Sequence, residues 1–119
     1  LVVLPGGQPG TGNLQKNDKV LAFLRTMHSG GKLVAAICAA PLVLQDAGLL
    51  QGINATCHPS VRDKLHSAHY IDNRVVVDGR IITSQAPGTA MEFSLKLIEV
   101  LFNKERVTAV NNGVLYLLQ

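Results

Sequence analysis

The stretch Lys32–Leu44, which reads K-L-V-A-A-I-C-A-A-P-L-V-L, decides the fold that this sequence predicts. Its first half, residues 33–37, is an unbroken apolar run of the kind found in a strand buried on both faces of a parallel sheet. Its second half can be helical, because Pro41 would lie in the first helical turn, where the missing N–H of proline costs nothing. Cys38 therefore falls on a sharp turn between a strand and a helix.

This turn makes Cys38 a candidate nucleophile. A sharp strand-to-helix turn lifts a side chain above the strand ends, and it tolerates only small neighbours two residues away, which Ala36 and Ala40 are. The positive end of the helix dipole favours the thiolate, which is the reactive form of cysteine. The alternative is an inert core residue, the commoner role of a lone cysteine in an apolar run.

Composition bounds the class of protein. The chain has 119 residues, of which 47% are hydrophobic and 16% charged, so one globular domain spanning 1–119 is expected. The net charge of +3 is spread along the chain without interleaved aromatic residues, which argues against a nucleic-acid partner. No apolar run approaches the ~20 residues of a membrane span, and no signal peptide is evident, so we expect a cytoplasmic protein without a membrane partner. Cys38 and Cys57 form neither a disulfide framework nor a zinc-ligand spacing.

The N-terminal residues predict a buried strand whose neighbouring segments are not all present in this sequence. Leu1–Leu4 reads as the middle of a buried strand and does not begin with Met. Such a strand needs neighbours on both sides to pair its backbone groups. We therefore expect either a preceding segment that is absent from this sequence or a second chain that supplies it.

A glycine-rich segment follows this strand. Residues 5–13 contain four Gly and two Pro, a composition that predicts a loop. Gly6 and Gly7 could turn the backbone tightly and point N–H groups into a cleft, as an oxyanion hole or a phosphate cradle requires. A plain turn is the alternative, and no Gly-Lys-Ser/Thr follows to make a phosphate loop.

The first half of the chain predicts a parallel sheet. Asn17 can cap a helix over residues 18–28, which precedes the strand that leads to Cys38. Alternation of strand and helix is the signature of an open parallel sheet covered on both faces. Ligands of such sheets bind beyond the carboxyl ends of the strands, where both the glycine pair and Cys38 fall.

Histidines supply the next candidates. His58 lies at the end of a predicted strand, and Pro59 holds it extended, so His58 could be an acid/base partner for a thiol or a plain surface residue. Cys57 alternates away from it and reads as a buried bystander. A metal site at His66 and His69 is not expected, because no carboxylate or further histidine is suitably placed.

The second half predicts a hairpin and a helix. Two β-branched runs within residues 74–83 flank Asp78-Gly79, the strongest short-range hairpin signal. The loop 84–89 follows, and Thr89 could cap the next helix in a capping box with Glu92.

Four motifs together carry a family resemblance. They are Leu4–Gly7, Ala35–Pro41, His58-Pro59 and Thr83–Thr89, in this order along the chain. With them the sequence resembles the ThiJ/PfpI superfamily, and more narrowly the branch of the parkinsonism-associated protein deglycase and its bacterial relatives. The resemblance implies an α/β, flavodoxin-like (class I glutamine-amidotransferase-like) three-layer sandwich with a mainly parallel sheet. It also implies that the first strand-helix portion of the domain is missing, and that the protein forms a homodimer.

The resemblance also implies roles for individual residues. Cys38 matches the family nucleophile, and Gly7 and Ala39 match the residues whose N–H groups face the bound oxygen. His58 matches the histidine near the thiol, and no metal or organic cofactor is implied. Gly6, Gln85 and Pro87 complete the substrate-binding positions that the motifs supply.

Some positions depart from the family pattern. Ala39 stands where the peptidase branch has His, which argues against peptidase chemistry. Gln85 replaces an Arg of some members and Ala86 a Gly of many, so polar contacts to substrate or across the dimer could differ. No position matches the acidic residue that hydrogen-bonds the family cysteine.

Three functions follow as hypotheses. The first is a cysteine-dependent glyoxalase or protein deglycase that acts on glyoxal, methylglyoxal or their early adducts, including glycated protein. The second is a redox-sensing chaperone in which Cys38 is oxidised to sulfinate. The third is an inactive fragment with an intact turn but no acid.

Overall fold

A four-stranded sheet forms the centre of the protein, whose computed structural model describes residues 1–116. The strands lie in the order β1 (Val2–Leu4), β2 (Val34–Ile37), β6 (Ile81–Ser84) and β5 (Val75–Asp78). β1, β2 and β6 are parallel, and β5 pairs antiparallel with β6. A separate pair of short parallel strands consists of β3 (Asn54–Ala55) and β4 (His69–Tyr70). The mainly parallel sheet predicted from the sequence is confirmed.

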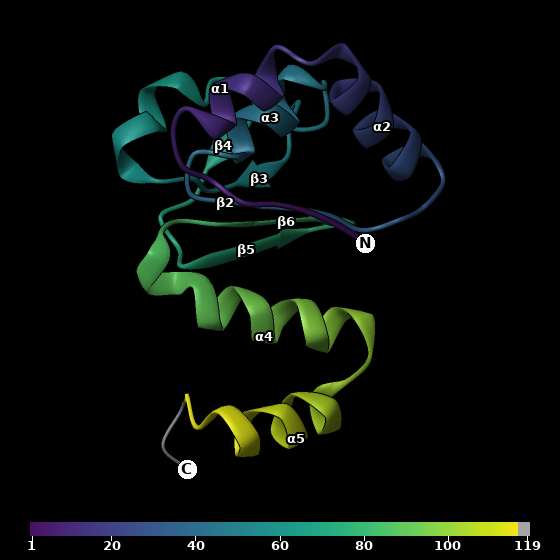
Figure 1. Ribbon diagram of the computed structural model, residues 1–119, viewed down its shortest axis with the longest axis vertical. Coiled ribbons are helices and arrows are strands. Elements are labelled where there is room, and N and C mark those ends of the chain that lie inside the picture. The colour runs from purple at the N-terminus through teal and green to yellow at the C-terminus, as the bar shows by residue number, and fades with distance from the viewer. Residues whose placement is uncertain (117–119) are drawn as a thin grey trace.

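Helices cover both faces of this sheet (Figure 1). The helical elements are α1 (Gly10–Gln15), α2 (Asp18–Ser29), α3 (Pro41–Asp46), α4 (Ala90–Leu101) and α5 (Lys104–Val114), with 3-10 turns η1 (Pro59–Lys64) and η2 (Pro87–Thr89). The first three helices lie on one face together with β3 and β4, and α4 lies on the other. α5 packs against α4 on the side away from the sheet, so it lies outside the three-layer sandwich.

Alternation along β2 builds two cores. Val34 and Ala36 are buried in the cluster beneath α2 and α3, whereas Ala35 packs with Ile82 and Phe93 beneath α4. Neighbouring residues of a strand point to opposite faces, so a strand covered on both sides must be apolar throughout. This is why the run before Cys38 has no polar interruption.

The helix α2 confirms the predicted cap. Asn17 Oδ1 accepts hydrogen bonds from the N–H groups of Lys19 and Val20 at 3.0 and 3.2 Å. These bonds satisfy donors that the first helical turn leaves free. The predicted helix over residues 18–28 is extended by one residue, to Ser29.

The prediction that residues 5–13 form only a loop was wrong at its C-terminal end. Gly10–Gln15 form α1, a short helix entered through hydrogen bonds from Thr11 N–H to Gly7 O (2.9 Å) and from Asn13 N–H to Pro9 O (3.0 Å). Gln8 Oε1 also accepts the N–H of Gly12 at 3.2 Å. Tertiary packing of α1 against α2 and α3 thus overrides the low helix propensity of glycine.

The predicted hairpin is confirmed, but the predicted capping box is not. The β5–β6 turn consists of Gly79 and Arg80, and Gly79 has a φ of 58°, a left-handed value that favours glycine. Thr89 makes no side-chain cap bond to α4. Glu92 Oε1 instead lies 2.7 Å from Arg74 Nε and accepts a hydrogen bond from the Tyr116 hydroxyl at 2.8 Å.

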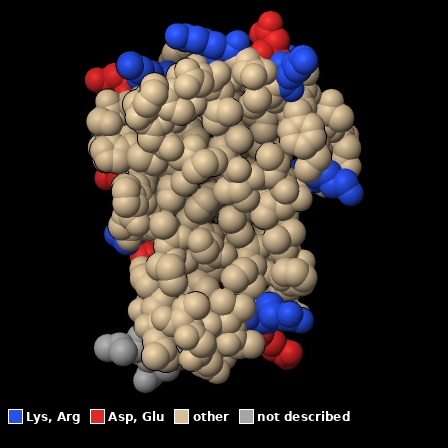
Figure 2. Space-filling view, in the orientation of Figure 1, with Lys and Arg blue, Asp and Glu red and all other residues tan. Residues whose placement is uncertain are grey.

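Charged side chains lie around the rim of the molecule on the face shown in Figure 2. Lys and Arg side chains occur there in separate groups, with acidic side chains close to some of them, and the middle of this face is uncharged. Within residues 1–116, no helix has both the length and the apolar character needed to cross a bilayer.

Candidate functional site

Cys38 occupies a left-handed turn between β2 and α3. Its φ is 67°, a value that a non-glycine residue adopts only at some energetic cost. Two hydrogen bonds hold this backbone in place: Cys38 N–H donates to Ser84 O at 3.1 Å, and Cys38 O accepts from His58 N–H at 2.8 Å. The flanking residues Ala36 and Ala40 are fully buried, so larger side chains there would not fit. The turn predicted from the sequence is present.

The glycine pair closes against this turn. A Cβ atom added to Gly6 would lie 2.7 Å from Cys38 Cβ and 2.8 Å from the carbonyl oxygen of Ile37, closer than real Cβ contacts allow. Gly7 meets no such obstacle, but its φ of 95° disfavours any side chain. Both positions therefore require glycine, the first for space and the second for backbone conformation.

Two backbone amides near the thiol remain free to bind a ligand. Within residues 1–116, neither the Gly7 N–H nor the Ala39 N–H donates a hydrogen bond to another backbone group. Ala39 is 6% exposed, and its nitrogen would lie 3.1 Å from a Cβ at Gly6, so this amide adjoins the glycine turn. An unpaired amide donor is rare at a buried residue such as Ala39, whereas Gly7 is exposed, and both amides are suited to an anionic oxygen.

A cavity of about 310 Å³ opens beside Cys38. Its wall consists of Gly6, Gly7, Ile37, Cys38, Pro87 and Ala90. Four of these were predicted as site residues, whereas Ile37 and Ala90 were not. Ile37 could have been found as the last strand residue before the turn, and Ala90 as the first residue of the helix after the predicted loop. Ala39, His58 and Gln85 do not belong to the cavity wall.

The ring of His58 is held by its own 3-10 turn. Nδ1 accepts the backbone N–H of Ser60 at 3.0 Å and lies 2.8 Å from Ser60 Oγ. Because Nδ1 accepts an N–H, the neutral ring carries its proton on Nε2. His58 thus contacts the cysteine turn through its backbone N–H, while Ser60 fixes the orientation of its imidazole.

Hydrogen bonds of its own side chains stabilise the loop after β6. Thr89 Oγ1 accepts the N–H of Ala86 at 3.1 Å and lies 2.6 Å from Ser84 Oγ. Gln85 Nε2 donates to Asp72 Oδ1 at 2.9 Å, so Gln85 ties two loops together. These contacts fix the backbone that carries Pro87 at the cavity.

Cys57 is the less reactive of the two cysteines. It is fully buried, and this burial raises the pKa of its thiol from 9.0 to about 11. The charge of Cys38 raises the pKa further, and Arg62 lowers it in part. Cys57 is therefore protonated at neutral pH, in agreement with its predicted role as a bystander.

Metal ligands do not converge in the part of the chain that the structure describes. No group of three or more His, Cys, Asp or Glu side chains there could hold a metal ion. His66 N–H donates to Gln45 Oε1 at 2.9 Å, and His69 belongs to β4, where its backbone pairs with Asn54.

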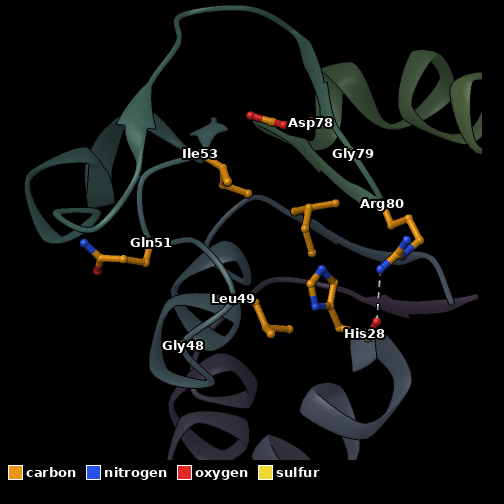
Figure 3. Close-up of a pocket in the computed structure, with 9 residues that line it drawn as sticks. His28, Gly48, Leu49, Gln51, Ile53, Asp78, Gly79 and Arg80 are labelled. Carbon is orange, nitrogen blue, oxygen red and sulfur yellow. Dashed lines mark hydrogen bonds between the residues drawn. The ribbon is translucent and has the colours of Figure 1, made fainter. Parts of the chain in front are cut away.

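A larger cavity of about 440 Å³ lies at the opposite end of the strands, near the N-terminus of β6 (Figure 3). Two of its charged side chains already have partners: Arg80 donates to His28 O at 3.5 Å, and Asp78 Oδ2 accepts the N–H of Asn54 at 2.8 Å. Since ligands of parallel sheets bind at the carboxyl ends of the strands, the smaller cavity at Cys38 is the better candidate.

Comparison with known proteins identifies the family. The family model described as DJ-1/PfpI matches residues 1–100. This chain belongs to the DJ-1/PfpI family. A solved DJ-1beta of Drosophila melanogaster has the same fold, with a TM-score of 0.94 and 45% identity over 98% of this chain and 64% of that chain. The predicted resemblance and fold class are confirmed.

Other members of the DJ-1/PfpI family are similar over most of this chain. The glutathione-independent glyoxalase DJR-1.2 of Caenorhabditis elegans is 38% identical over 92% of this chain and 59% of its own length. A structure of oxidized DJ-1 from Toxoplasma gondii has a TM-score of 0.88 and 43% identity over 95% of this chain and 62% of that chain. The chain thus spans about three fifths of the length of these relatives.

Proposed function

We propose that this chain is a cysteine-dependent glyoxalase or deglycase that acts on glyoxal, methylglyoxal or their early adducts. The observation that carries the proposal is the left-handed turn at Cys38, which faces a cavity beside the unpaired amides of Gly7 and Ala39. A family relative named as a glutathione-independent glyoxalase supports it. Neither a metal nor an organic cofactor enters the reaction.

The first step is addition of the thiol to an aldehyde. The Cys38 thiolate attacks the aldehyde carbon of methylglyoxal, a C–S bond forms, and the carbonyl electron pair moves to oxygen. The N–H groups of Gly7 and Ala39 hold this oxyanion, and one well-placed donor of this kind is typically worth ~3–4 kcal/mol. Protonation of the oxygen gives a hemithioacetal.

The second stage moves a proton between the two substrate carbons before water releases lactate. His58 is the candidate for this transfer, and it would act from Nε2 because Ser60 engages Nδ1. No acidic side chain belongs to the described wall of the cavity. The scheme therefore assigns this proton transfer to His58.

The test compares the two cysteines. Lactate formation from methylglyoxal is measured for the wild-type chain, Cys38→Ala and Cys57→Ala. We expect Cys38→Ala to abolish lactate formation and Cys57→Ala to preserve it. Activity of Cys38→Ala within about twofold of wild type would rule out the scheme, because a nucleophile accounts for far more than that.

A redox-sensing function is the second proposal, and it rests on the contrast between the two thiols. Cys38 is partly exposed, whereas Cys57 is buried. Hydrogen peroxide would transfer one oxygen atom to the Cys38 thiolate in each of two steps, releasing water each time and giving sulfinate. Intact-mass analysis after peroxide treatment should show two oxygens on Cys38. This result without lactate formation would favour the sensor, and an unreactive thiol without turnover would favour an inactive chain.

The homodimer, the second chain that supplies an N-terminal segment and the cytoplasmic location remain predictions. Each concerns the protein beyond the single chain described above.

A further inference from the structure

We propose that the cavity at the N-terminal end of β6 binds a small molecule with one carboxylate and an apolar body, and that Arg80 and His28 bind the carboxylate. This cavity of about 440 Å³ lies at the end of the strands opposite to Cys38 (Figure 3). Its volume is typical of small-molecule sites. The proposal is independent of the function proposed for Cys38.

The guanidinium of Arg80 is the cation that binds the carboxylate. The one hydrogen bond of this side chain within residues 1–116 runs from Nη2 to His28 O at 3.5 Å, which is long for such a bond. His28 O also accepts the Gly31 N–H at 3.1 Å, so this carbonyl has a partner without Arg80. A guanidinium presents several N–H donors in a planar fork that matches a carboxylate. Arg80 can therefore bind an anion without giving up a contact that the fold requires.

The ring of His28 is the second polar group at this place. It comes from the last turn of α2, whereas Arg80 comes from the β5–β6 turn, and Figure 3 shows the two side chains next to each other at the cavity. The His28 ring makes no hydrogen bond to another residue within residues 1–116, because the bond from Arg80 goes to the backbone oxygen. An imidazole donates through at least one ring nitrogen. Two separate elements thus direct donors to one anionic group.

Apolar groups line the cavity beside these donors. Leu49, Ile53 and Ile81 belong to the wall, and Ile81 is 3% exposed. Gly48 and Gly79 also belong to it, and a Cβ built on either glycine would meet no atom within 4 Å. The glycines therefore leave space inside the cavity, and an apolar ligand body that fills this space gains the free energy of removing hydrocarbon from water.

The acidic residue of the wall favours a ligand with a single carboxylate. Asp78 Oδ2 accepts the N–H of Asn54 at 2.8 Å, and Figure 3 shows the Asp78 side chain across the cavity from the His28 ring. A second carboxylate at the far end of the ligand would approach Asp78 and be repelled by it. The wall therefore suits a monocarboxylate better than a dicarboxylate of the same length.

The experiment compares three probes of equal chain length: hexanoate, its neutral amide hexanamide, and the dicarboxylate adipate. Each is titrated into the full isotope-labelled chain, and the NMR signals of the backbone amides give both the dissociation constant and the location. Signals of Gly48 and Gly79 report on this cavity, whereas signals of Gly6 and Gly7 report on the cavity at Cys38. We expect hexanoate to shift the signals of Gly48 and Gly79, and to bind about tenfold more tightly than hexanamide or adipate.

Three variants test the groups that bind the carboxylate. Arg80→Gln should weaken hexanoate binding by about tenfold, because it removes charge-assisted hydrogen bonds, and His28→Leu should weaken it by about threefold. Arg106→Gln is the matched control, since it removes the same charge from an exposed residue of α5, and it should change the affinity by less than about twofold. None of the three should change the affinity for hexanamide by more than about twofold.

Four results would overturn the inference: equal affinities for hexanoate and hexanamide, shifts confined to Gly6 and Gly7, equal losses in Arg80→Gln and Arg106→Gln, or no shift up to the solubility limit of hexanoate. If Arg80→Gln does not fold, as judged by circular dichroism, added salt provides the decision. Salt should weaken the binding of hexanoate and leave that of hexanamide unchanged, and equal responses would contradict the proposal. The titration requires no turnover, so failure of the glyoxalase proposal does not affect it.

Discussion

At the scale of single residues, Gly6 leaves room for the turn that carries Cys38. Gly6 touches the cysteine turn so closely that a Cβ would lie 2.7 Å from Cys38 Cβ, while Gly10 in the same segment has nothing within 4 Å of a built Cβ. The two glycines thus differ in the space around a Cβ, and Gly10 also differs in being the first residue of α1.

We therefore expect Gly6→Ala to lower the free energy of unfolding by about 1–3 kcal/mol, as overpacking does, and Gly10→Ala to change it by less than about 0.5 kcal/mol. Urea unfolding measures both. Gly6→Ala should also slow alkylation of Cys38, because the clash pushes on the turn that holds the thiol. Equal stability of the two variants would show that the glycine turn can move away from Cys38.

The buried thiol of Cys57 makes stability depend on alkaline pH. Burial raises its pKa from 9.0 to about 11, so the unfolded chain loses this proton at a lower pH than the folded chain. The stabilisation is complete below pH 9 and is lost as the pH rises toward 11. Relative to Cys57→Ala, the wild-type chain should lose about 2 kcal/mol of unfolding free energy over this window. Parallel curves for the two chains would mean that Cys57 is more accessible to water than its burial indicates.

At the scale of elements, the strand and the helix around Cys38 could be predicted because each has a clear local signal. An unbroken apolar run predicts a strand with helices on both faces of its sheet, and Pro41 marks the start of α3. Asn17 was predicted as a cap for the same reason, since its acceptor lies just before an amphipathic run. These signals are local, so one sequence is enough to find them.

Other elements depend on contacts that no local pattern reports. α1 is rich in glycine and forms because it packs against α2 and α3. The cavity residue Ala90 carries no chemical signal, and only the fold brings it next to Cys38. The orientation of His58 could not be predicted either, because Ser60 sets it through a turn that the sequence does not reveal.

Thr89 was predicted to cap α4, but in the structure its side chain forms hydrogen bonds within the preceding loop. Its Oγ1 braces the loop that leads from Ser84, whose carbonyl oxygen accepts the N–H of Cys38 at 3.1 Å. Thr89→Ala and Asn17→Ala should each cost about 1 kcal/mol or somewhat more, because each removes bonds to backbone donors. Only Thr89→Ala should change the alkylation rate of Cys38. An unchanged rate would show that the loop keeps its shape without the brace.

At the scale of the whole molecule, β1 and β5 are the two edge strands of the four-stranded sheet. β1 pairs with β2, and within residues 1–116 no strand pairs with its other side. Val3 on this strand is 40% exposed. The opposite edge strand β5 is flanked by β3, whose Asn54 N–H donates to Asp78 at 2.8 Å. An unpaired edge with apolar side chains is a template for association with another chain.

We expect this chain to self-associate in a concentration-dependent way, and Val3→Lys to shift it toward the monomer because an edge lysine opposes strand pairing. Light scattering after size-exclusion chromatography measures the mass. Val77→Lys is the control, because Val77 is similarly exposed, at 44%, on the strand that β3 flanks. A wild-type chain that stays monomeric throughout would show that the β1 edge is protected by its own twist.

The left-handed backbone at Cys38 makes the reactive thiol costly in folding stability. Glycine at this position would relieve the steric cost of a positive φ, roughly 1–2 kcal/mol, and would leave the turn in place. Selection for thermal stability alone would therefore favour glycine at this position. Such a variant would keep the fold and lose the reactive thiol.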